Sequence, residues 1–164
     1  MESAGFAPRN GQVSRNILPP PSSIPTDPAF VQLQELVAHL VRNARCQHPL
    51  GVTAYTPAAF GDTYPALYLR DFTYMAESAP ECIPPGHVRD IIALFIANLS
   101  PDGLCPERIS NDGEVIYICH GGHPAADSPL FLLKLCGAHL RHGGDRSFLA
   151  QILPDLVRTF ATVQ

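Results

Sequence analysis

A pair of opposite charges interrupts an otherwise apolar and aromatic segment, YPALYLRDFTYMAES, residues 64–78. Arg70 and Asp71 are adjacent there, and Tyr68 and Phe72 flank them. Such a pair can form part of a polar binding site framed by aromatic rings. It can equally be a first-turn Asp, favoured by the helix dipole, beside an Arg in solvent. Both interpretations stay open on this segment alone.

A second group of polar residues lies in residues 100–126, which contain Glu107, Arg108 and His123. Loops held by rigid helices are where binding residues usually occur. Glu107 and Arg108 can also be the solvated edge of a hairpin, and Asp127, which follows directly, can be an ordinary helix N-cap before Ser128. A cap can face a cavity, so the two roles of Asp127 are compatible.

The motif CHGGH, residues 119–123, raises the possibility of a structural zinc, because thiolates and imidazoles are good zinc ligands and Cys105 is close in the chain. Its spacing matches no common zinc pattern, and Gly121 and Gly122 are equally explained by a turn. The chain has no GxGxxG, P-loop or GxSxG motif. We therefore expect no metal and no cofactor.

Composition favours one soluble domain. The chain has 164 residues, 46% of them hydrophobic and 16% charged, and a formal net charge of -4. That charge, without a basic tract, argues against nucleic acid as a partner, and the apolar run at residues 91–97 is far shorter than the ~20 residues of a membrane span. Five scattered cysteines without an export signal favour a cytoplasmic protein.

Helix signals are clear from residue 26 onward, after a proline-rich segment, residues 1–25, that we expect to be a disordered leader. Thr26 or Asp27 caps a first helix with Pro28 in its first turn, and Phe30, Leu33, Val37, Leu40 and Val41 share one face. Later helices are expected near residues 68–79, 85–99, 127–142 and 147–163, the last interrupted or kinked by Pro154. Helices two and three, and four and five, should form antiparallel hairpins.

A single strand signal lies between the third and fourth helices. ERIS and EVIYI, residues 107–110 and 114–118, read as two strands joined by a turn at residues 111–113, with Ile109, Val115 and Tyr117 inward. The predicted fold class is therefore all-α, with one small β-hairpin in a loop.

Four segments in order carry a resemblance: YLRDFTYMAES, SPDGLCPERISNDGEV, ADSPLFLLKLC and GGDRSFL. They resemble the six-hairpin (α/α)6 toroid glycosidases of the glucoamylase and glycogen-debranching type. In that group an Arg-Asp pair opens an inner helix, a DGLIP-type loop follows the next helix, and an ADSPLWF-type segment begins the following inner helix. The resemblance covers residues 64–160 and implies that residues 26–164 form the first hairpins of a partial toroid.

The resemblance implies a carbohydrate site. Asp71 would accept hydrogen bonds from sugar hydroxyls, Arg70 would orient it or bind a hydroxyl, and Asp127 would line the same cavity. Further contacts are expected from the loop residues Glu107, Arg108 and His123 and from the ring of Tyr74. Tryptophan, which is common in sugar sites, is absent from the chain.

A complete toroid has twelve helices and needs at least ~190 residues, so this chain would supply less than half of it. Inverting hydrolysis needs an acid and a base ~6.5–9.5 Å apart, and in the resembled group later hairpins provide them. We therefore expect the carbohydrate-binding part of a glycoside hydrolase-like protein without its catalytic pair, completed by further chain or a partner. The alternatives are a non-catalytic helical interaction module and a small zinc-stabilised domain.

Overall fold

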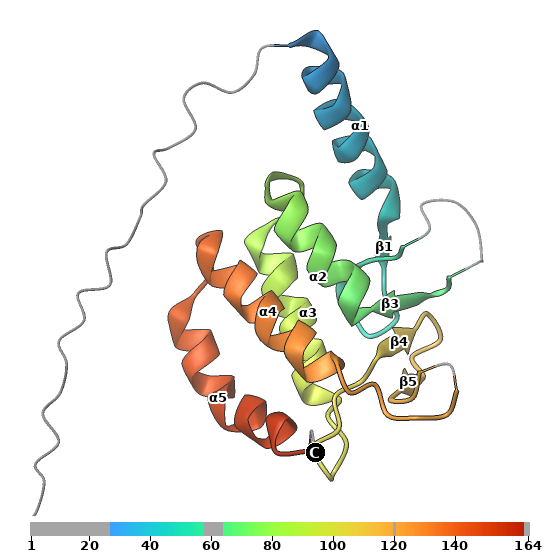
Figure 1. Cartoon of the computed structure of the whole chain (residues 1–164), viewed down its shortest axis with the longest axis vertical. Helices are drawn as coiled ribbons and strands as arrows, with labels where there is room; N and C mark the ends of the chain where they lie inside the picture. The colour runs from blue at the N-terminus through green and yellow to red at the C-terminus, as the bar shows by residue number, and fades with distance from the viewer. Residues whose placement is uncertain (1–26, 58–63, 120, 163–164) are drawn as a thin grey trace, which may run out of the picture.

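The computed structural model describes residues 27–57, 64–119 and 121–162 (Figure 1), so the expected leader lies outside the described residues. Within these ranges no helix has the length and hydropathy to cross a membrane. The helical elements are α1 (Pro28–Ala44), α2 (Leu69–Ser78), the 3-10 turn η1 (Pro80–Cys82), α3 (Pro85–Ala97), α4 (Ser128–Arg141) and α5 (Arg146–Phe160). The strands are β1 (Arg45–Gln47), β2 (Thr53–Tyr55), β3 (Ala66–Tyr68), β4 (Arg108–Ser110) and β5 (Val115–Ile116).

The helices begin where their capping residues predict. Asp27 caps α1, and its carboxylate accepts a hydrogen bond of 2.8 Å from the backbone N–H of Ala29, which satisfies one of the free donors of the first turn. Asp145 caps α5 in the same way, through the N–H of Ser147 at 2.8 Å. Pro154 lies inside α5, which is not interrupted there. The five predicted helices are therefore confirmed in number and position.

Two small antiparallel sheets show that the predicted all-α class is wrong and that the fold is mixed. The strands β1 and β2 form one sheet, and β3, β4 and β5 form the other, in that order. The predicted hairpin is confirmed as β4–β5, with Ile109 opposite Val115. The other strands are three residues long, too short to show a two-residue alternation in sequence. Strands β1 and β2 pair with each other across residues 48–52, whereas β3 pairs with a strand distant in the chain, as Tyr68 does with Arg108.

Helix α4 is the centre of the helical layer, because it packs against α2, α3 and α5 (Figure 1). We expected α2 to pair with α3, but its main neighbour is α4. The core between these helices is apolar and contains fully buried aromatic and aliphatic side chains, among them Phe72, Ile91, Phe95, Leu132 and Leu135.

The buried face of α4 cannot be identified from the positions of its apolar residues, because apolar residues also occur on its exposed face. Leu130 and Leu133 are exposed, whereas Leu132, Leu135 and Cys136 are buried. Apolar residues occur around most of this helix, so its sequence does not identify the face that meets the core.

Helix α1 extends away from the other helices (Figure 1). Val41 near its C-terminal end is buried, but Leu33 and Leu36 are 55% and 52% exposed. The predicted apolar face of α1 therefore exists, and most of it has no neighbour within the part of the chain that the structure describes.

A buried histidine closes the turn between α4 and α5. His139 is 3% exposed, and its Nε2 accepts a hydrogen bond of 3.1 Å from the backbone N–H of Asp145. The proton of the neutral ring must then be on Nδ1, which has no hydrogen-bond partner among the described residues. Gly144 lies against this ring, so close that any side chain there would collide with it.

We expect the substitution Gly144→Ala to destabilise the protein by about 1–3 kcal/mol, because its Cβ would lie 2.4 Å from atoms of the His139 ring. Gly86→Ala is the matched control, since a Cβ at Gly86 meets nothing within 4 Å and lies in a helix. Urea unfolding of both variants measures the difference. Equal stability of the two variants would contradict the packing described.

We expect His139 to make stability depend on pH. Burial lowers its pKa below the ordinary 6.5; the Asp145 carboxylate opposes this shift and the Arg89 guanidinium adds to it. The unfolded chain therefore binds the proton more tightly, and stability is lost as the pH falls below about 6.5. His139→Asn should flatten the slope of the free energy of unfolding against pH, because it removes the titrating ring. Parallel slopes for the wild type and His139→Asn would refute this.

Candidate functional site

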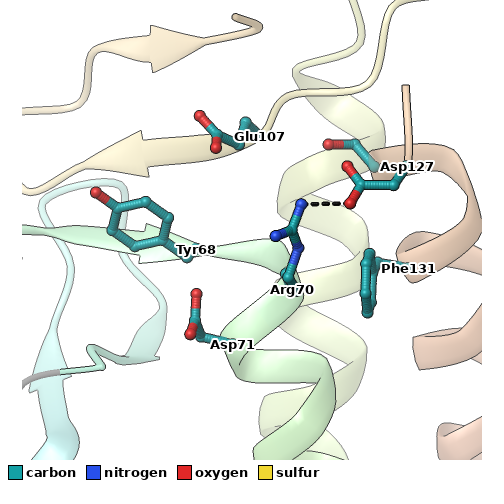
Figure 2. A pocket seen from close by; sticks show the side chains of 7 residues that line it. Tyr68, Arg70, Asp71, Glu107, Asp127 and Phe131 are labelled. Atoms are coloured by element: carbon teal, nitrogen blue, oxygen red, sulfur yellow. Dashed lines mark hydrogen bonds and ion pairs between the residues drawn. The ribbon is translucent and has the colours of Figure 1, made fainter. Parts of the chain in front are cut away.

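A cavity of about 170 Å³ opens where α2 and α4 begin, beside Glu107, the residue directly before β4 (Figure 2). We call it the carboxylate cavity. It is lined by Tyr68, Arg70, Asp71, Glu107, Asp127, Ser128 and Phe131. Three segments far apart in the sequence therefore contribute three carboxylates, one guanidinium and two aromatic rings to one hollow.

Arg70 is the cation of the cavity. Its side chain extends from the first turn of α2 towards Asp127, with which it forms a hydrogen-bonded ion pair (Figure 2). Its Cζ lies 5.4 Å from the ring centroid of Phe131. The two charged side chains are 52% and 41% exposed, so we expect the pair to add only about 0–1 kcal/mol to stability. Asp127 is the N-cap residue of α4, but its side chain accepts no hydrogen bond from the backbone of the first turn.

The backbone of Glu107 fixes its position at the edge of the cavity. Its carbonyl accepts a hydrogen bond of 3.1 Å from the N–H of Leu69, and its own N–H donates to the carbonyl of Ile116 at 2.8 Å. The carboxylate forms an ion pair with Arg108, whose Cζ lies 5.5 Å from the ring centroid of Tyr68. Glu107 is therefore joined to the start of α2, to β5 and to an aromatic ring of the lining.

Asp71 is the third residue of α2, and its carboxylate forms no hydrogen bond or ion pair with any described residue. A carboxylate in the first turn of a helix is favoured by the helix dipole. Its oxygens are therefore available to accept hydrogen bonds from a ligand without breaking a contact within the described chain.

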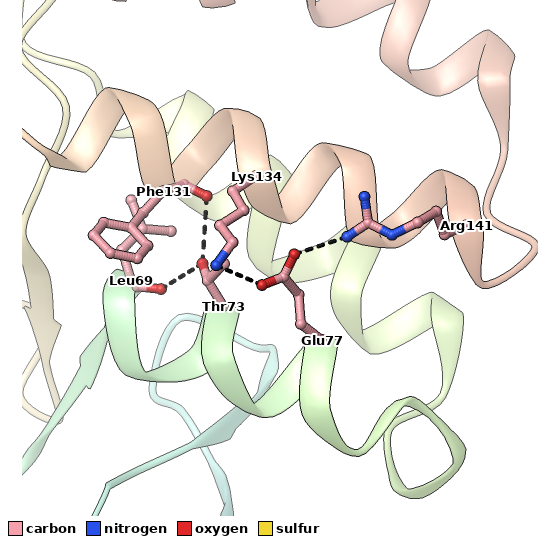
Figure 3. A network of polar contacts seen from close by, with 6 residues as sticks. All are labelled: Leu69, Thr73, Glu77, Phe131, Lys134 and Arg141. Atoms are coloured by element: carbon pink, nitrogen blue, oxygen red, sulfur yellow. Dashed lines mark hydrogen bonds and ion pairs between the residues drawn. The ribbon is translucent and has the colours of Figure 1, made fainter. Parts of the chain in front are cut away.

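Buried and partly exposed contacts hold α2 and α4 in parallel, so that their first turns meet at the cavity (Figure 3). The buried hydroxyl of Thr73 donates its one proton to the Leu69 carbonyl of α2 at 2.7 Å, and the backbone carbonyl of Phe131 in α4 lies 3.3 Å from the same oxygen. Further along, Glu77 pairs with both Lys134 at 2.6 Å and Arg141 at 2.7 Å. This succession of contacts fixes the register between the two helices.

Of the site residues predicted from sequence, Arg70, Asp71, Glu107 and Asp127 line the cavity together. Arg108 holds Glu107 without lining the cavity. The other two predicted residues lie elsewhere. Tyr74 lines a neighbouring hollow, and His123 is in an exposed turn where its carbonyl accepts from the N–H of Cys119.

Sequence reasoning missed Phe131, whose ring lines the cavity beside Arg70. The sequence feature that could have identified Phe131 is its spacing of four residues from Asp127, because that spacing brings both side chains to the same face of α4.

The described residues, which leave out His120, contain no group of three or more His, Cys, Asp or Glu side chains placed to hold a metal ion. Burial raises the pKa of Cys105 to about 12, and its thiol donates to the carbonyl of Pro106. Cys105 is therefore a protonated thiol at neutral pH, which does not suit a nucleophile. Cys119 donates to the carbonyl of His123 at 3.3 Å.

Comparison with protein-family models, with curated proteins and with solved structures finds no match.

Proposed function

We propose that this chain is the carbohydrate-binding part of a glycoside hydrolase-like protein and that the carboxylate cavity binds a sugar. The observation that carries the proposal is the meeting of Arg70, Asp71, Glu107 and Asp127 in one hollow. A sugar offers several hydroxyls that both donate and accept, and carboxylates with a guanidinium match them in both directions. The resemblance to six-hairpin glycosidases leads to the same four residues.

The charge and shape of the cavity suit a neutral sugar. Three carboxylates outnumber the single guanidinium of the lining, so an anionic ligand meets net repulsion. The rings of Tyr68 and Phe131 stand beside the charges and offer apolar surface to the C–H face of a pyranose.

The chain's role in this proposal is binding. Hydrolysis of a glycosidic bond needs a carboxylic acid that donates a proton and a second carboxylate that acts as base or nucleophile. Two of the three carboxylates, Glu107 and Asp127, are already engaged by Arg108 and Arg70, an arrangement that suits hydrogen-bond acceptors. In this proposal further chain or a partner supplies the acid and base.

The unpaired thiols of all five cysteines favour a reducing compartment, the cytoplasm.

We expect Asp71→Asn to weaken binding of a neutral glycan by about 10- to 100-fold, because an amide loses one of the two acceptor oxygens and the charge of the carboxylate. Stability should change by less than about 1 kcal/mol, since Asp71 has no partner within the described chain. A glycan array identifies a bound neutral oligosaccharide, and titration calorimetry with that oligosaccharide compares the proteins.

The matched control is Asp102→Asn, at an exposed aspartate in the turn after α3, which should leave affinity unchanged. Undiminished binding by Asp71→Asn, or an equal loss in both variants, would overturn the assignment of Asp71. An array without any bound neutral glycan would overturn the carbohydrate function itself.

A second candidate is a helical interaction module, and a separate apolar groove favours it. This groove, of about 380 Å³, lies between α1 and α2. It is lined by Val37, Leu40, Val41, Ala44, Pro57, Tyr74, Met75, Ser78 and Ala79. Leu33 and Leu36 are exposed on α1, one turn before the groove residues Val37 and Leu40, and they extend the apolar surface of the groove. An apolar groove of this kind fits the apolar face of a helix from a partner chain.

For the interaction module we expect the wild-type chain to associate at concentrations of tens of micromolar, on the order of a weak protein–protein affinity. Leu36→Glu should shift it to the monomer, because the charge would be buried in the contact. Sedimentation velocity measures the change, and Leu153→Glu, at an equally exposed leucine of α5 outside the groove, is the control. A wild-type monomer that melts cooperatively would count against this candidate.

A further inference from the structure

A second hollow lies directly beside the carboxylate cavity. Its volume is about 180 Å³, and we call it the Tyr74 hollow. It is lined by Tyr74, Asp127, Leu130, Phe131 and Lys134. Asp127 and Phe131 belong to both linings, so the two hollows adjoin at these side chains.

Neither hollow alone reaches the size that small-molecule sites usually have, ~300–1,000 Å³. The carboxylate cavity measures about 170 Å³ and the Tyr74 hollow about 180 Å³. Taken together they reach the lower end of that range. The lining of the second hollow, with Tyr74 and Lys134, lies further along α2 and α4 from the start of both helices.

The chemistry of the Tyr74 hollow is amphipathic. Tyr74 and Leu130 present apolar surface, and both are about half exposed although they pack on neighbouring residues. Lys134 lies over the ring of Tyr74, with its Nζ 4.7 Å from the centroid, and binds Glu77. A pyranose unit has an apolar C–H face and a rim of hydroxyls, so a ring, an aliphatic side chain and an ammonium donor match its two kinds of surface.

The aromatic surface of the hollow is held in place before any ligand arrives. The rings of Tyr74 and Phe131 meet edge to face, with centroids 5.4 Å apart at an angle of 73°. Arg70 lies over the ring of Phe131, so two side chains of α2, those of Arg70 and Tyr74, contact this ring. An exposed ring that its neighbours already immobilise loses little conformational entropy on binding.

From this geometry we infer that the two hollows are consecutive subsites for one neutral oligosaccharide, with one unit in the carboxylate cavity and the next in the Tyr74 hollow. The inference rests on the proposed carbohydrate function and adds a chain-length preference to it. The ligand crosses from one unit to the next over Asp127 and Phe131. Asp127 can accept from hydroxyls of both units, because it lines both hollows.

The test is the dependence of affinity on chain length. The probes are glucose and mannose, and the α-linked disaccharide and trisaccharide of each, titrated against the full chain by calorimetry or by NMR line broadening. We expect the disaccharide of the bound series to bind about tenfold or more tightly than its monosaccharide. Tyr74→Ala should remove most of this gain and change the affinity for the monosaccharide by less than about twofold, whereas Tyr74→Phe should retain the gain.

The matched control is Tyr64→Ala, which removes a tyrosine of equal exposure, 50% against 49%, outside both hollows. It should leave the gain from the second unit intact. Thermal unfolding shows whether each variant is folded. If Tyr74→Ala fails to fold, Lys134→Met replaces it, because the ammonium of Lys134 lies over the Tyr74 ring in the same hollow, and the same loss is expected.

The outcomes separate the two proposals. Equal affinity for the monosaccharide and disaccharide would overturn the second subsite and leave the carbohydrate function standing. An equal loss for both probes in Tyr74→Ala, or a retained gain, would also overturn it. Absence of binding by all six sugars, together with an array on which no neutral glycan binds, would overturn both proposals together.

Discussion

The parallel contact between α2 and α4 is the constraint on which the site depends. The buried Thr73 hydroxyl lies at its centre and reaches the carbonyl of Phe131. The proton of this hydroxyl has its shorter partner, the Leu69 carbonyl, within α2, so the register between the helices depends on the side-chain packing and on the ion pairs of Glu77 with Lys134 and Arg141. With this register fixed, Arg70 and Asp127 come to the same end of the molecule as ion-pair partners. Sites built on helix starts inherit their geometry from such contacts.

The small sheet of β3, β4 and β5 supplies the second half of that geometry. Tyr68 is at once the last residue of β3 and the residue before α2, and it lies opposite Arg108 in the sheet. The N–H of Leu69, which a helix cannot satisfy internally, donates to the carbonyl of Glu107. The sheet therefore places Glu107 beside the start of α2, and the backbone carbonyl of Glu107 accepts a hydrogen bond from the first residue of that helix. The loop residues and the helix residues of the carboxylate cavity are parts of one hydrogen-bonded unit.

Local signals in the sequence were sufficient for the helices and for part of the site. An Asp before Pro28 and the spacing of apolar residues specified α1, and the NDG turn specified the β4–β5 hairpin. The other strands could not be predicted, because a three-residue strand exists only through its partner. The buried face of α4 was also beyond reach, since Leu130 and Leu132 are chemically alike and the neighbouring helices decide which of them is covered. Arg70, Asp71 and Asp127 share one cavity because their motifs mark helix starts, and Glu107 joins them because the residue after it pairs with Tyr68 in the sheet. Tyr74 and His123 were chosen for residue type alone.

The ion pair between Arg70 and Asp127 has a consequence for selectivity. The two groups satisfy each other within the site, but both are about half exposed, so separating them costs little free energy. A ligand that offers a donor to the carboxylate and an acceptor to the guanidinium would replace both partners of the pair at once. A ligand with a single polar group would replace only one of them and would leave the other to water. The pair would therefore favour ligands whose polar groups are closely spaced.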